Sequence, residues 1–221
     1  MLYIVSTPIG NLQDITFRAV ETLKSVDLIA AEDTRHTKIL TSHYNITTPL
    51  TSYFEHNKIK KADYLIGLLK EGKDIALVTD AGTPGISDPG YQLIKLAQQR
   101  DIAIVVVPGA TALIAALSIS GMPAHAFVFE GFLPVKSAAR KKRLAALSNE
   151  TRTVIIYESP HRLIKCLTDI AGVLGDPTVV CCRELTKKFE EVKRARACEL
   201  IEYFSSHKPR GEFVLIFNPG H

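Results

Sequence analysis

Residues 75–107 read IALVTDAGTPGISDPGYQLIKLAQQRDIAIVVV, and this stretch contains the pattern that decides the fold. The apolar run Ile75–Thr79 predicts a buried strand, Gly90–Arg100 has the spacing of a helix, and Ile102–Val107 predicts a second buried strand. A loop rich in glycine and proline joins the first strand to the helix. A strand, a helix and a strand in this order form a βαβ unit, which implies a parallel sheet covered by helices.

The same alternation extends over the first half of the chain. Further strands are expected at Leu2–Ser6 and Leu28–Ala31, and further helices at Ile15–Lys24, Thr34–His43, Ile59–Lys70 and Ala110–Ser120. Gly121-Met122-Pro123 then interrupts the pattern. We therefore expect an α/β domain over residues 1–120.

The second half continues the alternation but ends differently. Strands are expected at Phe127–Glu130, Thr153–Tyr157, Val179–Arg183, Glu190–Arg196 and Glu212–Phe217, and helices at Lys136–Leu147, at Leu163–Leu174 and up to about Phe204. The closely spaced strands near the end indicate antiparallel members. The predicted fold is two α/β domains, 1–120 with a parallel sheet and 121–221 with a mixed sheet, and a cleft between them.

Charge is distributed unevenly between these halves. The chain of 221 residues is 46% hydrophobic, which excludes a disordered protein, and its net charge of +4 is too small to identify a nucleic-acid binder from composition. Residues 1–120 hold 11 basic and 12 acidic groups, whereas residues 121–221 hold 16 and 11. The second half, with a net charge of +5, is the basic one.

The cysteines and the N-terminal sequence indicate the cellular compartment in which the protein is expected. Cys166, Cys181, Cys182 and Cys198 include no CxxC pair, so we expect free buried thiols and no metal site. The N-terminal sequence MLYIVSTPIGN lacks the basic and long apolar regions of a signal peptide, which favours a cytoplasmic location.

One uncharged segment, Ile102–Met122, is long enough to be tested as a membrane span. Pro108-Gly109 divides it into a β-branched part and a part rich in alanine and leucine. The segment is therefore interpreted as a strand, a loop and a helix, and no membrane association is expected.

Three loops that contain glycine follow predicted strands of the first half, at Thr7–Asn11, Asp80–Gly90 and Pro108–Ala112. In a parallel sheet, the carboxyl ends of the strands are where loop amides and helix N-termini converge on a ligand. Each loop alone is also explained as a tight turn between a strand and a helix. The three together favour a binding site.

Missing motifs narrow the class of ligand. The chain contains neither GxGxxG nor GxxxxGK[ST], so neither a dinucleotide pyrophosphate nor a nucleotide γ-phosphate is expected in the site. A nucleoside without phosphates fits better. Asp80 and Thr83 are suited to bind ribose or amino-acid groups, and the apolar loop walls are suited to adenine.

Seven segments in order along the chain form a combined pattern: Thr7–Leu12, Ala31–Arg35, Asp80–Gly90, Pro108–Ala112, Gly131–Pro134, Tyr157–Arg162 and Arg183–Lys187. Together they resemble the tetrapyrrole methylase superfamily. Within the superfamily they resemble the branch that methylates a cytidine ribose 2′-hydroxyl of 16S ribosomal RNA at the decoding centre. The resemblance implies S-adenosylmethionine as cofactor, 16S rRNA or the small ribosomal subunit as partner, and a homodimer. Members of this branch continue beyond the segment Gly211–Leu215, and if that continuation grips RNA, its absence here weakens acceptor binding.

The resemblance also implies which residues contact the methyl donor. They are Pro8, Ile9, Asp80, Gly82, Thr83, Pro84, Ile86, Ser87, Thr111, Ala112, Tyr157 and Leu185.

Basic residues supply candidates for contact with RNA. Lys136, Arg140, Lys141, Lys142 and Arg143 place five cations within eight residues without an acid, which suits phosphate contact, although a solvated helix face has the same pattern. Arg35 and Arg162 are further candidates. A second basic stretch, residues 187–196, is diluted by Glu190 and Glu191 and is interpreted as surface.

Methyl transfer to a hydroxyl needs alignment of the acceptor and removal of a proton. Glu158 is the candidate base, followed by Glu32 and Asp33. For Asp33 the simpler reading is helix capping, since an acid at a helix start is favoured by the dipole.

Two alternatives remain open at this point. One is a methyltransferase of the same fold that acts on a tetrapyrrole or a protein side chain. The other is a nucleoside-binding or RNA-binding module without catalysis.

Overall fold

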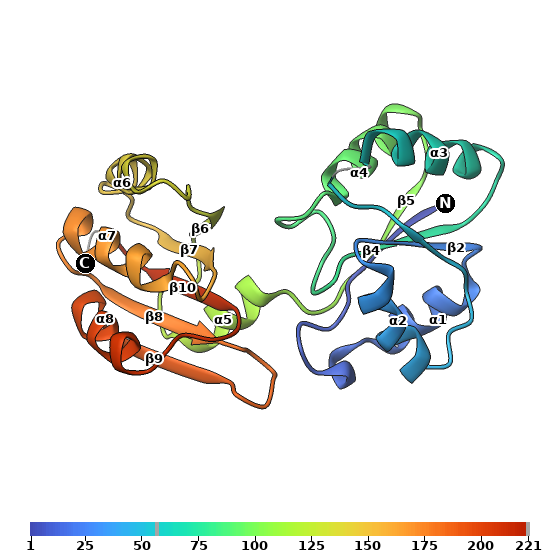
Figure 1. The fold of residues 1–221 in the computed structure, drawn as a ribbon. Helices are drawn as coiled ribbons and strands as arrows, with labels where there is room; N and C mark the ends of the chain where they lie inside the picture. Colours follow the sequence, from blue (N-terminus) through green and yellow to red (C-terminus); the bar gives the residue numbers. More distant parts are fainter. Residues whose placement is uncertain (56–57, 220–221) are drawn as a thin grey trace. The chain divides into compact units, whose positions relative to one another are not determined.

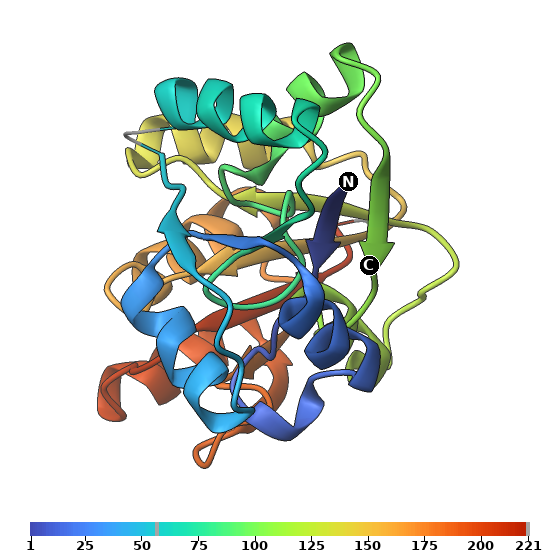
Figure 2. The same ribbon diagram turned by 90° about the vertical axis from the view of Figure 1, so that its right-hand side faces the viewer.

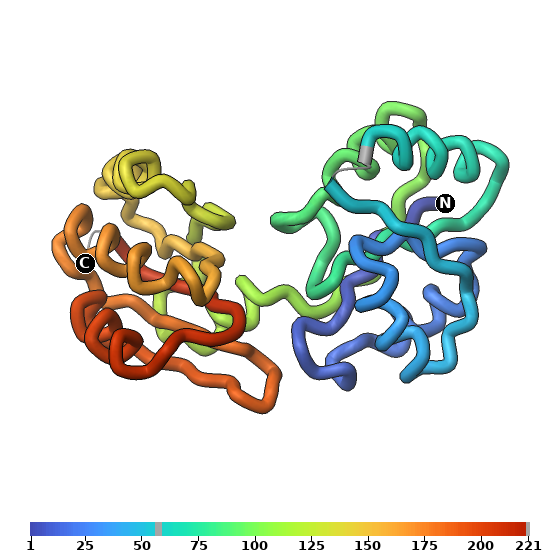
Figure 3. Tube along the Cα trace, viewed as in Figure 1, coloured from blue at the N-terminus to red at the C-terminus, as the bar shows by residue number. Residues whose placement is uncertain are grey.

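The computed structural model describes residues 1–55 and 58–219, and its contacts divide the chain into two compact units, Met1–Thr111 and Ala112–His221 (Figures 1 and 3). Each unit has a five-stranded sheet. The first sheet is parallel and the second is mixed. The prediction of two α/β units, the first with a parallel sheet and the second with a mixed sheet, is confirmed.

The first unit alternates strands and helices. Its elements are β1 (Leu2–Val5), η1 (Leu12–Asp14), α1 (Phe17–Ser25), β2 (Leu28–Ala31), α2 (Thr34–His43), β3 (Leu50–Ser52), α3 (Lys58–Lys70), β4 (Ile75–Val78), α4 (Gly90–Gln99) and β5 (Ile104–Val107). The strand order is β3-β2-β4-β1-β5, with all neighbours parallel. The starts of α1 and α2 are capped by local side chains; the Thr16 hydroxyl, for example, accepts from the Ala19 amide at 3.1 Å and so begins α1.

Both faces of the inner strands β1, β2 and β4 are largely buried, which explains their continuous apolar sequences. Along β4, Ile75 and Leu77 pack with α3 and α4, whereas Ala76 and Val78 pack with α1 and α2. Figure 2 shows α3 on one side of the strands and the blue helices α1 and α2 on the other.

The second unit begins with a helix. Its elements are α5 (Ala112–Ser120), β6 (Phe127–Phe132), α6 (Ser137–Ala146), β7 (Thr153–Glu158), α7 (Leu163–Leu174), β8 (Thr178–Arg183), β9 (Glu191–Arg196), α8 (Ala197–Ser206) and β10 (Phe213–Phe217). The order β6-β7-β10-β8-β9 pairs β6 and β7 in parallel and the remaining neighbours antiparallel. Helices α6, α7 and α8 share one apolar core with the sheet, and α5 contacts β7 and β10.

The structure places the division between the units earlier than the sequence suggested. The break lies between Thr111 and Ala112 rather than after residue 120. The reason is that α5 packs on β7 and β10 of the second sheet, so the helix belongs to the second unit.

One strand was missed, and two further expectations are corrected. The short edge strand β3 was not anticipated. Strand β6 runs to Phe132, two residues beyond the expected end, because a bulge between Phe129 and Gly131 shifts its register. Cys198 is exposed, whereas the other three thiols are buried as expected.

The segment Ile102–Met122 contains β5, a loop and α5, as predicted. Among the described residues, the helices are all too short or too polar to cross a membrane.

Candidate functional site

In the first sheet, the connections that follow two neighbouring strands run in opposite directions. From β1 the chain crosses over α1 to β2, and from β4 it crosses in the opposite direction over α4 to β5. Strands β1 and β4 are neighbours, and α1 and α4 lie on opposite faces. Ligands of open α/β sheets bind outside the carboxyl ends of the strands at such a switch point. The loops after β1 and β4 are therefore the centre of the candidate site.

These two loops are joined directly. The Thr7 amide donates to the Gly82 carbonyl at 2.9 Å, the Gly82 amide returns a bond to the Thr7 carbonyl at 3.2 Å, and the Thr7 hydroxyl donates to the Thr79 carbonyl at 3.1 Å. Gly82 has φ +90°, a conformation that favours glycine. Sequence reasoning identified both loops but not this bridge between them.

A chain of hydroxyl groups adds the loop after β5. Thr83 Oγ1 lies 2.9 Å from Ser6 Oγ and 2.7 Å from Thr111 Oγ1, and it also contacts the Ala110 carbonyl at 3.2 Å. Three loops that are distant in sequence thus share one polar cluster. Thr83 and Thr111 were predicted site residues, whereas Ser6 was missed because a single serine after a strand carries no sequence signal.

Asp88 organises the remainder of the long loop. Its carboxylate accepts from the Gly85 amide at 2.9 Å and from the Gly90 amide at 2.7 Å, at the start of α4. Burial raises the pKa of Asp88, and these amide bonds oppose the shift. Sequence reasoning missed this residue, although an aspartate two positions before a helix is a capping signal. Its bonds fix the backbone between Pro84 and Ser87, which includes three of the predicted donor contacts.

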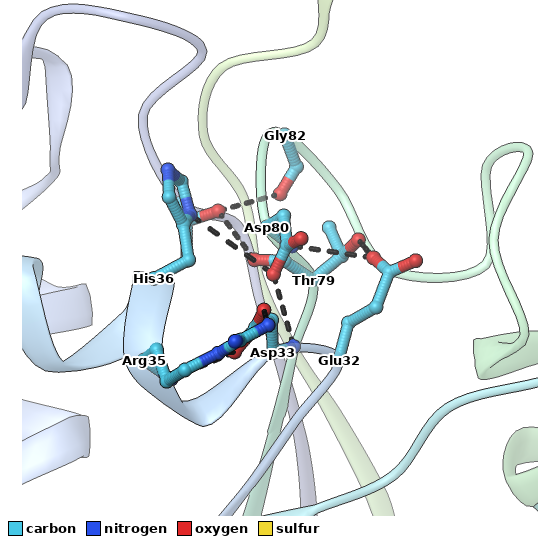
Figure 4. Close-up of polar contacts among 8 residues, drawn as sticks. Glu32, Asp33, Arg35, His36, Thr79, Asp80 and Gly82 are labelled. Carbon is cyan, nitrogen blue, oxygen red and sulfur yellow. Dashed lines mark hydrogen bonds and ion pairs between the residues drawn. The ribbon is translucent and has the colours of Figure 1, made fainter.

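Acidic groups gather where β2 and β4 end (Figure 4). Glu32 Oε2 accepts from the Thr79 hydroxyl at 2.5 Å, and Asp80 Oδ1 accepts from the Asp33 amide at 3.0 Å, with His36 Nδ1 4.0 Å away. Partial burial, together with the charges of Glu32 and Asp33, raises the pKa of Asp80. The predicted residues Glu32, Asp33 and Asp80 are therefore brought together.

Asp33 is occupied as the cap of α2. Its carboxylate accepts from the Arg35 amide at 2.8 Å and from the Arg35 guanidinium at 2.7 and 3.1 Å. These bonds lower the pKa of Asp33 to about 2. Such a weak base is unsuited to accept a proton, so the capping interpretation replaces the catalytic one. The Arg35 side chain is 90% exposed.

In the second unit, three motif segments reach one edge of the sheet. Phe132 pairs with Tyr157, and Phe213 pairs with both Glu158 and Arg183, so β6, β7 and β8 all end at this edge. The Tyr157 hydroxyl accepts from the Leu113 amide at 3.2 Å, and burial raises the Tyr157 pKa.

The segment after β8 has an unusual backbone. Glu184 (φ 50°) and Thr186 (φ 67°) are both left-handed, and Leu185 between them is buried. The Glu184 carboxylate holds the turn by accepting from the Glu212 amide at 3.0 Å and from Lys187 Nζ at 2.9 Å. Thr186 Oγ1 is buried without a hydrogen-bond partner.

Glu158 does not match its expected role as a base. It is only 2% exposed, its Oε1 accepts from the Ser159 amide at 2.7 Å, and its Oε2 lies 3.3 Å from Arg162 Nη2. Buried and paired, the carboxylate cannot contact an acceptor. Arg162 is correspondingly not free for phosphate, because the same Nη2 donates to the Leu133 carbonyl at 2.6 Å.

The basic cluster on α6 is also corrected in part. Arg140 is 3% exposed and forms an ion pair with Asp169 at 2.6 Å. Arg143 is bound by both carboxylate oxygens of Glu130 at 2.6 Å. The exposed lysines Lys136, Lys141 and Lys142 remain as candidate phosphate contacts.

Comparison with known proteins places these features in a family. Residues 1–201 match the family model described as tetrapyrrole (corrin/porphyrin) methylases. Proteins named ribosomal RNA small subunit methyltransferase I are similar over nearly the whole chain. The Synechocystis protein is 52% identical over 98% of this chain and 78% of its own length, and the Thermotoga maritima protein is 46% identical over 98% and 97%.

Solved structures show the same fold at low identity. Diphthine synthase has a TM-score of 0.78 at 13% identity and covers 98% of this chain and 89% of its own. Uroporphyrin-III C-methyltransferase from Thermus thermophilus, complexed with S-adenosylhomocysteine, has a TM-score of 0.69 at 18% identity, with 98% and 96% covered.

The close approach of the loops predicts a cost for Gly109→Ala. A Cβ at residue 109 would lie 2.9 Å from Ser6 Cβ, so the β1 and β5 loops would have to separate. We expect the free energy of unfolding to fall by about 1–3 kcal/mol, as for other overpacked sites. Urea denaturation measures it. Gly67→Ala, where a Cβ meets nothing within 4 Å inside α3, is the control and should not destabilise. A Gly109→Ala variant as stable as the parent would contradict the packing described.

Proposed function

Because the chain belongs to the tetrapyrrole methylase family, we propose that it transfers a methyl group from S-adenosylmethionine to 16S ribosomal RNA, at the ribose 2′-hydroxyl of a decoding-centre cytidine. The observation that carries the proposal is the similarity of 46–52% identity, over nearly the full chain, to proteins named for methylation of small-subunit RNA. Tetrapyrrole and protein acceptors receive less support, since the neighbours with those acceptors are 13–19% identical and share the fold alone.

The first-unit loops fit the chemistry of this donor. S-adenosylmethionine combines cationic ammonium and sulfonium groups with a ribose diol and an apolar adenine face. The Asp80 carboxylate complements the cations or the diol, and the Thr83–Thr111 hydroxyls and the Gly82 backbone supply further polar groups. Apolar contacts are supplied by Pro8, Ile9, Pro84, Ile86 and Ala112, with Ser87 at the turn. The sequence prediction of donor contacts also includes Tyr157 and Leu185, which lie in the second unit.

When bound, S-adenosylmethionine supplies an activated methyl group, so the residues of the chain mainly have to orient the acceptor and remove its proton. Of the three carboxylates considered, Glu158 is buried and Asp33 is a strongly acidic cap. We therefore assign proton removal to Glu32, which the Thr79 hydroxyl holds at the end of β2.

Acceptor binding is assigned to the exposed cations. Arg35 stands at the start of α2 with its side chain 90% exposed, next to the acidic cluster. Lys136, Lys141 and Lys142 are exposed in the basic half of the chain. A cytoplasmic location follows from a ribosomal substrate.

A homodimer is part of the proposal. Helix α5 carries no charged residue, and its Ile114 and Ile119 are 50% and 51% exposed. An uncharged helix with two exposed isoleucines suits contact with a second copy. Ile114→Glu should therefore sediment as a monomer where the parent sediments as a dimer; a parent that is monomeric at all concentrations would remove this part of the proposal.

The function is tested by transfer of labelled methyl groups to small ribosomal subunits that lack the modification. We expect one cytidine of 16S rRNA to carry the label in a form that resists alkaline cleavage, as a 2′-O-methyl group does. Arg35→Ala should lose transfer while its affinity for S-adenosylhomocysteine stays unchanged, and the matched surface variant Arg100→Ala should retain both. Label on a base, or undiminished transfer by Arg35→Ala, would contradict the assignment.

The acidic cluster predicts a pH dependence of donor binding. The pKa of Asp80 is raised above its ordinary value of 3.8, so this carboxylate gains its proton earlier than other aspartates as the pH falls. We expect the affinity for S-adenosylmethionine to decrease over that range. Asp80→Asn should bind about 10- to 100-fold more weakly at neutral pH and lack the decrease.

Calorimetric titration across pH measures this effect. Asp63→Asn, on the exposed face of α3, is the matched control, and His36→Gln separates the contribution of the neighbouring imidazole. A parent and an Asp80→Asn variant with the same pH profile would show that Asp80 does not contact the donor.

A further inference from the structure

We propose that Phe132–Lys136, the last residue of β6 and the loop that leads to α6, is a platform on which a base of single-stranded RNA stacks, and that Arg140 and Arg162 are positioning residues that hold it. The inference rests on the proposed function, because it supplies a binding surface for the RNA acceptor. It also reassigns two arginines that the sequence had suggested for direct phosphate contact.

Three consecutive carbonyl groups of the segment accept hydrogen bonds from the two arginines. Arg162 Nη2 donates to the Leu133 carbonyl at 2.6 Å, and Arg140 Nη1 donates to the carbonyls of Pro134 and Val135 at 3.3 and 3.1 Å. The Leu133 side chain is buried at 2% exposure and anchors the segment in the core. Guanidinium groups suit this task because their donors have a fixed planar geometry.

Each arginine forms an ion pair with a buried carboxylate, and for Arg140 the pair is also hydrogen-bonded. Asp169 binds Arg140 Nε at 2.7 Å and Nη2 at 2.6 Å, and it also accepts from the hydroxyl of Ser137, the first residue of α6. Glu158, whose side chain is fully buried, faces Arg162 at 3.3 Å. Buried ion pairs contribute little net stability, because desolvation offsets their attraction. Two such pairs beneath one short segment are therefore better explained by the geometry they impose on it.

The segment so held exposes an aromatic and an apolar side chain. Phe132 is 53% exposed and Val135 is 73% exposed. The Phe132 ring meets Tyr157 in an edge contact at 5.8 Å between centroids, which supports it from one side. A rigid, half-exposed aromatic ring is the feature on which unpaired RNA bases stack.

The charge around the segment identifies a polyanion as its partner. The sequence contains no acidic residue from Gly131 to Asn149, and Lys136 and Lys142 are exposed. Lys141 lies 3.6 Å from Asp169, and Arg143 is neutralised by Glu130. An exposed aromatic ring followed in the chain by exposed lysines matches the combination of stacking and backbone attraction that single strands use.

The test measures binding of the full chain to two oligoribonucleotides of equal length, one with bases and one abasic. Stacking requires bases, whereas phosphate contact does not. We expect Phe132→Ala to bind the base-bearing strand about 5- to 100-fold more weakly and the abasic strand as the parent does. Phe132→Trp should retain the preference for bases.

Tyr64→Ala is the matched control. Tyr64 on α3 is 52% exposed, close to the 53% of Phe132, and Lys61 Nζ lies 4.4 Å from its ring centroid. This variant should bind both strands as the parent does. The proposal would be overturned if Phe132→Ala bound both strands as the parent does, or lost affinity equally for both. It would also be overturned if, in a parallel assay, the variant lost affinity only for anionic lipid vesicles.

The positioning role has its own readout. Arg162→Lys keeps the charge but loses the planar fork, so we expect a raised KM for RNA, an unchanged kcat and a lost preference for bases. Arg140→Lys should show the same three effects. If Arg140→Lys does not fold, Arg162→Lys alone tests the positioning role, because the Arg162 side chain is 21% exposed. An unchanged KM and an unchanged base preference in Arg162→Lys would refute positioning.

Different results would reject the platform and the proposed function. Base-dependent RNA binding through Phe132 without methyl transfer would leave the platform and remove the enzymatic function. Methyl transfer by Phe132→Ala with the same KM for RNA as the parent would leave the enzymatic function and remove the platform.

Discussion

The divergence of the chain between β1 and β4 is the constraint on which the first unit depends. Because the connections leave these neighbouring strands in opposite directions, their loops open away from each other at the sheet edge. The Thr7–Gly82 backbone bridge and the Ser6–Thr83–Thr111 hydroxyls then tie the loops together. The result is a polar edge of fixed geometry, on which the proposed donor contacts lie.

In the second unit, charged groups hold the loop segments at the sheet edge. Its three motif segments end at one sheet edge, and the groups that hold them are largely buried: Asp169 with Arg140, Glu158 with Arg162, and Glu184 with Lys187. Most of the charged residues in these motifs thus act on the backbone beside them. Phe132 and the lysines Lys136, Lys141 and Lys142 are exposed, and these are the residues that the proposal assigns to RNA.

Sequence alone predicted the elements with clear periodicity and missed those set by distant contacts. Both bounds of Leu163–Leu174 were predicted, since its apolar spacing is strong and Gly175 ends it. The three-residue β3 has too short a pattern to detect. The allocation of α5 failed because a uniformly apolar helix does not indicate which sheet it covers. Arg140 looked like a surface cation because its partner, Asp169, is 29 residues away.

The most direct measurement is hydrogen–deuterium exchange of the full chain with and without S-adenosylhomocysteine. The account predicts slower exchange in the three loops at the carboxyl edge of the first sheet, residues 6–11, 79–90 and 108–111. Helices α1 and α3 should be unaffected away from that edge. Unchanged exchange in these loops under saturating ligand, or protection confined to other segments, would contradict the placement of the methyl donor at the switch point.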